Sequence, residues 1–138
     1  MPSQPKRIII VGCGRTGAEL ARQMSRAGNK VVVIDKDVES LKRLGPEFRG
    51  QTLVGNGVSA ANLIEAGIEQ AGVLVSVTNR NCVNIAAALI AQKHFCVERV
   101  VARITDPRSV SLYESAGIHI LCPTAVLAAE AERIIMAS

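Results

Sequence analysis

Short runs of β-branched residues alternate along this chain with segments whose apolar residues recur at helical spacing. The predicted strands are residues 7–11, 31–34, 52–54, 73–77, 100–104 and 118–121. Helices are predicted over residues 16–27, between 36 and 44, after an Asn-Gly turn at 56–57, over 81–93, over 108–116 and from 123 towards 136. Parallel strands joined by helices form right-handed crossovers. The pattern therefore predicts an α/β fold, a Rossmann-like doubly wound six-stranded parallel sheet in the order 3-2-1-4-5-6.

The length and the composition favour a single domain over residues 1–138. Hydrophobic residues make up 49% of the chain, but it has no Trp, one Tyr and two Phe. The core must therefore consist of Val, Ile, Leu and Ala, which suits a parallel sheet covered by helices. The longest apolar run, residues 85–91, is far shorter than the roughly 20 residues that cross a bilayer, so we expect a soluble, unexported protein.

Charge and cysteine content exclude two further classes of protein. The formal net charge of +4 suggests nucleic-acid binding, but the basic residues are scattered and aromatic residues for base stacking are almost absent. We therefore expect no nucleic-acid partner. The four cysteines have neither metal-site spacing nor the density of a disulfide scaffold, which predicts reduced thiols in a cytosol and no metal site.

The segment from Gly12 to Gly17 matches the pattern G-x-G-x-x-G between a predicted strand and a predicted helix. Asp35 ends the second strand 35 − 14 = 21 positions after the middle glycine, close to the offset of about 20 in dinucleotide-binding domains. Gly12 permits the tight turn, Gly14 lets a phosphate approach the backbone, and Gly17 lets the helix pack on the strand. The combination predicts an adenine-nucleotide site; a tight turn without a ligand is the alternative.

Charged residues around this turn refine the prediction. The free N–H groups and the dipole of a helix N-terminus attract an anion, and Arg15 at that end is unfavourable unless a phosphate lies there. Asp35 would accept hydrogen bonds from the ribose and repel the 2′-phosphate of NADP, an effect that Lys36 weakens. The alternatives are a solvated strand-end acid at Asp35 and an arginine turned into water at Arg15.

These motifs, together with the segments 54–56, 65–69, 75–78 and 100–103, resemble the regulator-of-potassium-conductance (RCK) family, the N-terminal TrkA-N domain of Trk and Ktr potassium uptake regulators. The resemblance runs from Arg7 to the last helix. It implies a non-enzymatic cytoplasmic domain, peripheral to the inner face of the membrane, that binds NAD(H), ATP, ADP or AMP and gates a potassium channel or transporter. The binding residues that motif and resemblance together indicate are Gly12, Cys13, Gly14, Arg15, Thr16, Gly17, Asp35, Lys36, Asn56, Gly57, Thr78 and Arg103.

The resemblance also implies individual roles. Arg15 would reach the outer phosphates, Thr78 would lie near the phosphates, and Asn56 would meet the adenine. The family usually has aspartate at that position; asparagine keeps a carbonyl acceptor but loses the charge. An ordinary turn residue is the alternative for Asn56, and a structural role is the alternative for Thr78 and Arg103. An acidic cluster frequent in the family is replaced by residues 79–81, Asn-Arg-Asn, so no metal or nicotinamide role is carried over there.

The last predicted helix is too apolar for an isolated monomer. Residues 125–136 are interrupted only by Glu130, Glu132 and Arg133, and the sheet is complete before them. We therefore expect a crossover helix over about 123–138 that packs on a second subunit. The result would be a homodimer or, by further assembly of dimers, a larger ring.

Two other functions share the glycine turn. An NAD-dependent oxidoreductase fragment would need an acid or base beside the hydride path, but Tyr113 lacks a lysine four positions later, and His94 and His119 have no recognisable catalytic partner. A domain that binds S-adenosylmethionine also places glycines after the first strand and an acid after the second. Both remain alternatives, with no catalytic residue assigned.

Overall fold

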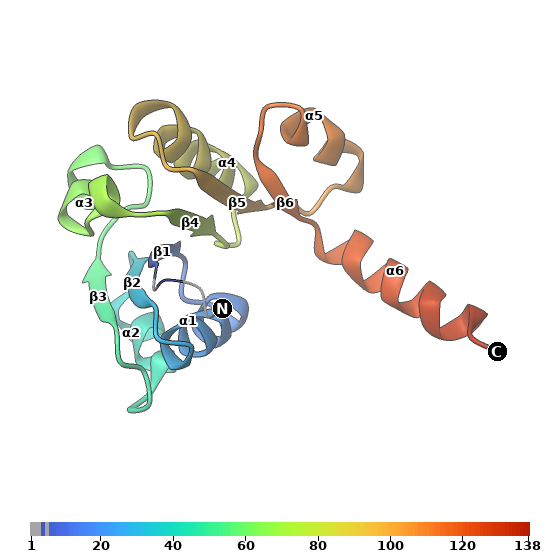
Figure 1. The fold of residues 1–138 in the computed structure, drawn as a ribbon, viewed down its shortest axis with the longest axis horizontal. Coiled ribbons are helices and arrows are strands. Elements are labelled where there is room, and N and C mark those ends of the chain that lie inside the picture. The colour runs from blue at the N-terminus through green and yellow to red at the C-terminus, as the bar shows by residue number, and fades with distance from the viewer. Residues whose placement is uncertain (1–3, 5) are drawn as a thin grey trace.

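A computed structural model describes residue 4 and residues 6–138, so residues 1–3 and 5 of the predicted domain lie outside the described part. Its sheet is parallel, in the order β3-β2-β1-β4-β5-β6, which confirms the predicted order. The strands are β1 (Arg7–Val11), β2 (Lys30–Asp35), β3 (Gln51–Val54), β4 (Val73–Ser76), β5 (Arg99–Arg103) and β6 (His119–Leu121). Figure 1 shows the strands with helices on both sides of the sheet.

The helices lie where the periodicity placed them, although several are shorter than predicted. They are α1 (Arg15–Arg26), α2 (Val38–Leu41) with a 3-10 turn over Lys42–Leu44, α3 (Ala60–Glu65) with another over Ile68–Gln70, α4 (Asn81–Leu89), α5 (Val110–Glu114) after a 3-10 turn over Pro107–Ser109, and α6 (Pro123–Met136). The predicted helix over 81–93 changes to π-helical geometry over Ile90–His94.

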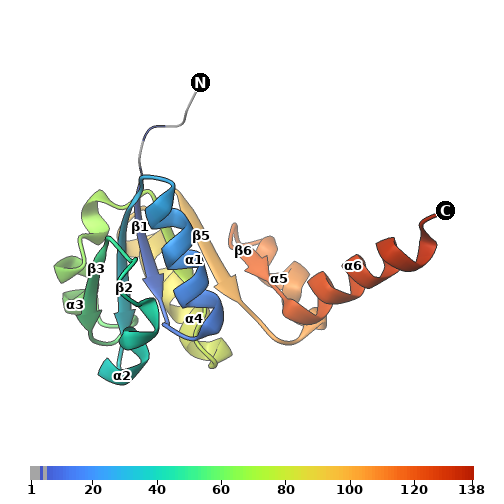
Figure 2. The ribbon, with the colours of Figure 1, turned by 90° about the horizontal axis from the view of Figure 1, so that it is seen from below.

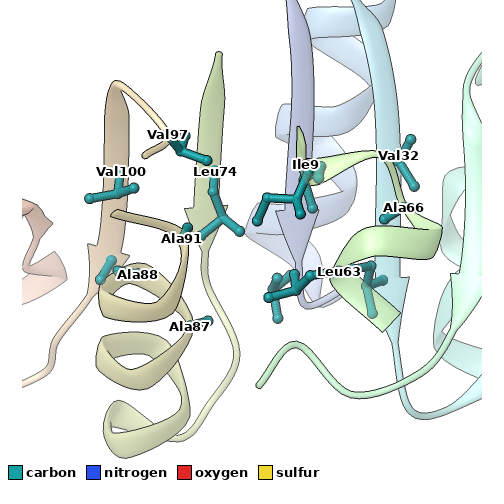
Figure 3. Packing of buried hydrophobic residues seen from close by; sticks show 14 of the residues in the cluster. Ile9, Val32, Leu63, Ala66, Leu74, Ala87, Ala88, Ala91, Val97 and Val100 are labelled. Atoms are coloured by element: carbon teal, nitrogen blue, oxygen red, sulfur yellow. The ribbon is translucent and has the colours of Figure 1, made fainter. Parts of the chain in front are cut away.

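Successive residues of the inner strands point to opposite faces of the sheet and feed two separate cores. Ile9 and Leu74 pack with Leu63 of α3 and with alanines of α4 (Figure 3). Ile8, Ile10 and other strand residues pack on the opposite face against α1, α2 and the turn after it. Both faces of the inner strands are therefore covered by helices of the same chain, as their continuous β-branched sequence predicts.

The C-terminal helix α6 takes no part in either core. Figures 1 and 2 show it extending away from the sheet beyond β6, and none of its residues is buried. Its large apolar side chains are 58–75% exposed: Val126, Leu127, Ile134, Ile135 and Met136. Within the described residues, no helix combines the length and the apolar character that crossing a bilayer requires.

Candidate functional site

A cavity of about 500 Å³ opens at the carboxyl ends of the central strands, where β1 separates β2 from β4. Crevices at such points are the usual ligand sites of doubly wound sheets. The cavity is lined by Val11, Gly12, Cys13, Gly14, Arg15, Thr16, Ile34, Asp35, Lys36, Ser40, Arg43, Gly55, Asn56, Gly57, Val77, Thr78, Asn79, Arg80, Val83 and Arg103. Every residue predicted to bind the ligand is among them except Gly17, which lies buried beneath the turn.

The three motif glycines meet different spatial demands. Gly12 has φ +105° and donates its N–H to the Ile34 carbonyl oxygen at 2.8 Å, and a Cβ there would lie 2.9 Å from the Thr78 backbone nitrogen. A Cβ on Gly17 would overlap the carbonyl oxygen of Gly12. A Cβ on Gly14 would meet nothing within 4 Å, so the space above this residue is open to a ligand.

The N-terminus of α1 opens into this cavity. Gly14 is the N-cap residue, no side chain of the described residues caps the helix, and its first turn contains no acidic residue. The first N–H groups of the helix therefore lack intrahelical partners, and the helix dipole adds partial positive charge there. Arg15 and Thr16 are exposed beside them. This arrangement favours an anion such as a phosphate.

The Asp35 carboxylate holds the glycine turn in place, a role that the sequence did not indicate. Its Oδ2 accepts the Cys13 N–H at 2.7 Å, and its Oδ1 accepts the Asp37 N–H at 2.8 Å. Each carboxylate oxygen has two lone pairs, so each retains one for a further donor. Asp35 is half-buried at the cavity wall, where it can both fix the turn and accept ribose hydroxyl groups.

Cys13 contributes only its backbone to the cavity. Its side chain is fully buried in the core beneath α1. Burial, and then the negative charge of Asp35, raise the pKa of the Cys13 thiol, so the thiol is neutral at physiological pH. Thiolates are the reactive form of cysteine, and this side chain therefore has a packing role.

The Asn56-Gly57 turn forms the wall beyond β3. The Asn56 N–H donates to Asn62 Oδ1 at 2.8 Å, and Asn56 Oδ1 accepts the Val58 N–H at 3.0 Å. Gly57 is buried, and a Cβ there would overlap the Val11 side chain. The Asn56 carbonyl expected to meet adenine is thus already engaged in the turn, which leaves it one lone pair for a ligand.

Asn84 of α4 organises the floor on the other side of the cavity, a role that no pattern in the sequence indicated. The fully buried Oδ1 accepts hydrogen bonds from Ser76 Oγ at 3.1 Å, from the Thr78 N–H at 2.9 Å and from Thr78 Oγ1 at 2.6 Å. Its Nδ2 donates to the backbone carbonyls of Thr78 and Arg103, both at 3.0 Å. One side chain therefore joins β4, α4 and β5, and it engages the Thr78 hydroxyl expected near the phosphates.

The cavity is strongly cationic. Five basic residues line it, Arg15, Lys36, Arg43, Arg80 and Arg103, against one acidic residue among the described lining residues, Asp35. Arg43 and Arg80 were not expected from the motif. No group of three His, Cys, Asp or Glu in the described part of the chain could hold a metal ion. The cavity therefore favours an anion and offers one carboxylate as a hydrogen-bond acceptor.

Substitution of Gly17 with alanine is expected to lower the free energy of unfolding by about 1–3 kcal/mol, because the added methyl group would force α1 away from the Gly12 carbonyl. Urea denaturation measures the change. Gly14→Ala is the matched control in the same motif, since its Cβ enters open space. Equal stabilities of the two variants would contradict the close approach of Gly17 to the Gly12 carbonyl oxygen.

Substitution of Asn84 with alanine is expected to lower the free energy of unfolding by about 2–3 kcal/mol, because it leaves buried backbone groups of Thr78 and Arg103 unpaired. Asn81→Ala, one turn earlier on α4, removes exposed hydrogen bonds with Thr105 and should lower it by about 1 kcal/mol or less. Thermal unfolding of both variants checks the difference, and a larger loss in Asn81→Ala would disprove the role of Asn84.

Comparison with known sequences identifies relatives over most of the chain. The model of the TrkA-N domain family matches residues 8–123. The Trk system potassium uptake protein TrkA of Streptomyces coelicolor is 45% identical over 111 residues, which are 80% of this chain and 50% of that protein. Its homologue from Archaeoglobus fulgidus is 36% identical over 135 residues, 94% of this chain and 30% of that protein. The chain thus spans half the length of these relatives or less.

Solved structures show the same fold. The TrkA-N domain of the inner membrane protein ybaL from Escherichia coli has a TM-score of 0.82 at 17% identity and covers 96% of this chain and 98% of its own. The Shewanella denitrificans Kef CTD in AMP-bound form has a TM-score of 0.77 at 23% identity, over 96% of this chain and 83% of its own. GsuK bound to ADP also has a TM-score of 0.77 at 23% identity and covers 95% of this chain and 34% of its own. The GsuK channel bound to NAD has a TM-score of 0.70 at 17% identity and covers 89% of this chain and 22% of its own. Because the family model matches most of its length, this chain belongs to the TrkA-N family, as its motifs indicated.

Proposed function

We propose that this chain is the nucleotide-sensing domain of a potassium uptake regulator and that its ligand is an adenine nucleotide, either NAD(H) or ATP, ADP or AMP. The observation that carries the proposal is the uncapped N-terminus of α1, which opens into the cavity above Gly14 with the Asp35 carboxylate beside it. AMP, ADP and NAD in solved structures of this fold support the ligand class.

The geometry supports one orientation of the nucleotide. The phosphates would accept hydrogen bonds from the first N–H groups of α1 and from the Arg15 side chain. The ribose hydroxyls would donate to the free lone pairs of Asp35, and the adenine would lie towards the Asn56-Gly57 turn. Hydrogen bonds from backbone N–H groups to side-chain oxygens hold both the glycine turn and the Asn56-Gly57 turn. The pocket is therefore formed before the ligand arrives.

The residues that line the cavity fit a regulatory role better than the catalytic role of an oxidoreductase. His94, His119 and Tyr113 do not line the cavity, and the Asp35 carboxylate is engaged by backbone N–H groups. We propose a non-enzymatic cytoplasmic domain, peripheral to the inner face of the membrane, that gates a potassium channel or transporter. Such gating requires that the nucleotide bind one arrangement of the assembly more tightly than another.

We further propose that α6 packs on a second copy of the chain, giving a homodimer or a ring built from such dimers. The helix exposes an apolar surface that its own sheet does not cover, and burial of apolar area contributes about 25 cal/mol per Å². A two-fold pair would exchange the two helices and bury both surfaces in equivalent environments. The chain would then form a dimer that joins two nucleotide pockets.

Calorimetric titration with NADH, NAD, ATP, ADP, AMP and S-adenosylmethionine tests the ligand class. At least one adenine nucleotide should bind, and Gly14→Val should abolish this binding without unfolding the protein, because the valine side chain would occupy the open space above the turn. Gly72→Val is the matched control: its Cβ also meets nothing within 4 Å, but the residue lies outside the cavity. Selective binding of S-adenosylmethionine, or no binding, would overturn the proposed function.

Sedimentation equilibrium tests the dimer. The protein should form a dimer, and Val126→Glu on α6 should weaken it by tenfold or more, because a carboxylate would be buried in an apolar contact. Val38→Glu on α2 introduces the same charge at a valine of similar exposure, 55% against 58%, and should leave the dimer unchanged. A monomer at every concentration of the unmodified protein would refute the exchange of α6.

A further inference from the structure

Four of the five basic residues that line the cavity lie on two sides of the glycine turn, and the fifth lies between them. Lys36 follows β2, and Arg43 lies in the 3-10 turn after α2. Arg80 precedes α4, and Arg103 ends β5. Arg15 begins α1 between the two groups. We call Thr78, Asn79, Arg80, Val83 and Arg103 the β4–β5 wall; it carries two guanidinium groups and no acidic residue.

The orientation of an adenine nucleotide determines which part of it meets this wall. Asp35 at the end of β2 places the ribose on one side of β1, and the N-terminus of α1 places the phosphates above β1. In the order of the sheet, β4 and β5 lie on the opposite side of β1 from β2. Whatever follows the phosphate at the helix N-terminus therefore extends towards the β4–β5 wall.

Both arginines of the wall are positioned by the structure around Thr78. The half-buried Arg103 donates from Nη1 to the Thr78 carbonyl oxygen at 3.2 Å. The Arg80 N–H donates to Thr78 Oγ1 at 3.1 Å, and that hydroxyl is in turn held by Asn84. The Asn84 network thus fixes the backbone from which both side chains leave, while the exposed Arg80 guanidinium itself contacts Cys82 Sγ at 3.9 Å.

We infer that the pocket selects ADP or ATP, whose terminal phosphate is joined to the nucleotide through a single oxygen, over NAD, and that Arg80 and Arg103 hold this terminal phosphate. This inference rests on the proposed nucleotide function. A terminal phosphate with one substituted oxygen carries about −1.5 to −2 charge at pH 7, and planar guanidinium groups match its oxygens.

NAD presents a different group to the same wall. It shares the adenosine and both phosphates of ADP. Its second phosphate, however, is esterified to nicotinamide riboside and therefore carries a single charge. The oxidised nicotinamide ring is itself a cation, which two guanidinium groups without a neighbouring carboxylate repel. Since the rest of the two ligands is identical, the difference in their binding arises where the second phosphate and its substituent meet the β4–β5 wall.

Calorimetry of the unmodified protein with ADP, ADP-ribose and NAD in EDTA and low salt isolates this wall, because the three ligands differ only beyond the second phosphate. ADP is expected to bind about tenfold or more tightly than NAD, with ADP-ribose between them. The preference should shrink at high salt, because the charges that produce it are partly exposed.

Substitutions locate the preference in the wall. Arg80→Gln and Arg103→Gln should each weaken ADP about three- to tenfold and change NAD less than about twofold, so that the ratio of the two affinities falls. Arg99→Gln is the matched control, since Arg99 is an exposed arginine at the opposite end of β5, outside the cavity. The ratio of ADP affinity to NAD affinity in Arg99→Gln should equal that of the unmodified protein.

The outcomes separate this inference from the function on which it rests. Binding of NAD as tight as that of ADP, or equal weakening of both ligands in the two variants, would overturn the selection of a terminal phosphate while leaving an adenine-nucleotide sensor intact. Absence of binding by every adenine nucleotide would overturn the proposed function itself.

Discussion

The hydrogen bond from the Cys13 N–H to the Asp35 carboxylate fastens the end of β2 to the turn after β1, and a second bond from the Asp37 N–H holds that carboxylate in place. The start of α1 follows that turn directly, so the direction of its free N–H groups is set by the same contact. Gly17 lets the helix approach the turn closely enough for this arrangement. The anion site is therefore organised by the fold in advance, and a ligand need not order the backbone to bind.

The two sides of the cavity are stabilised by different means. On the β2 side, the Asp35 carboxylate organises a backbone that faces the cavity. On the β4–β5 side, the neutral amide of Asn84 is buried and fully engaged, and the charged groups project beyond it. A neutral amide satisfies buried backbone groups without the desolvation penalty of a buried ion. The fold thereby keeps its ionic groups at the surface of the cavity.

The sequence predicted the sheet and the glycine turn because both depend on local patterns. β-branched runs reveal strands buried on both faces, and the offset between Gly14 and Asp35 reflects the length of one strand-helix-strand unit. Asn84 was missed because a single asparagine in an apolar helix has no periodic signal, although a lone polar residue among buried alanines could have been noticed. Arg43 reaches the cavity through tertiary folding from a segment distant in sequence from the glycine turn, whereas Arg80 was missed because residues 79–81 differ from the family's acidic cluster. The predicted role of the Asn56 carbonyl ignored its local hydrogen bond to the Val58 N–H.

The helix α6 joins the domain only through the short segment after β6, and its own residues remain exposed. Its 14 residues make a rod about 21 Å long. Over that length, a rotation of about 10° at Cys122 and Pro123 displaces the far end by between 3 and 4 Å, roughly two residues of helical rise. The helix is thus geometrically a lever arm that enlarges small tilts of the sheet edge where β6 lies.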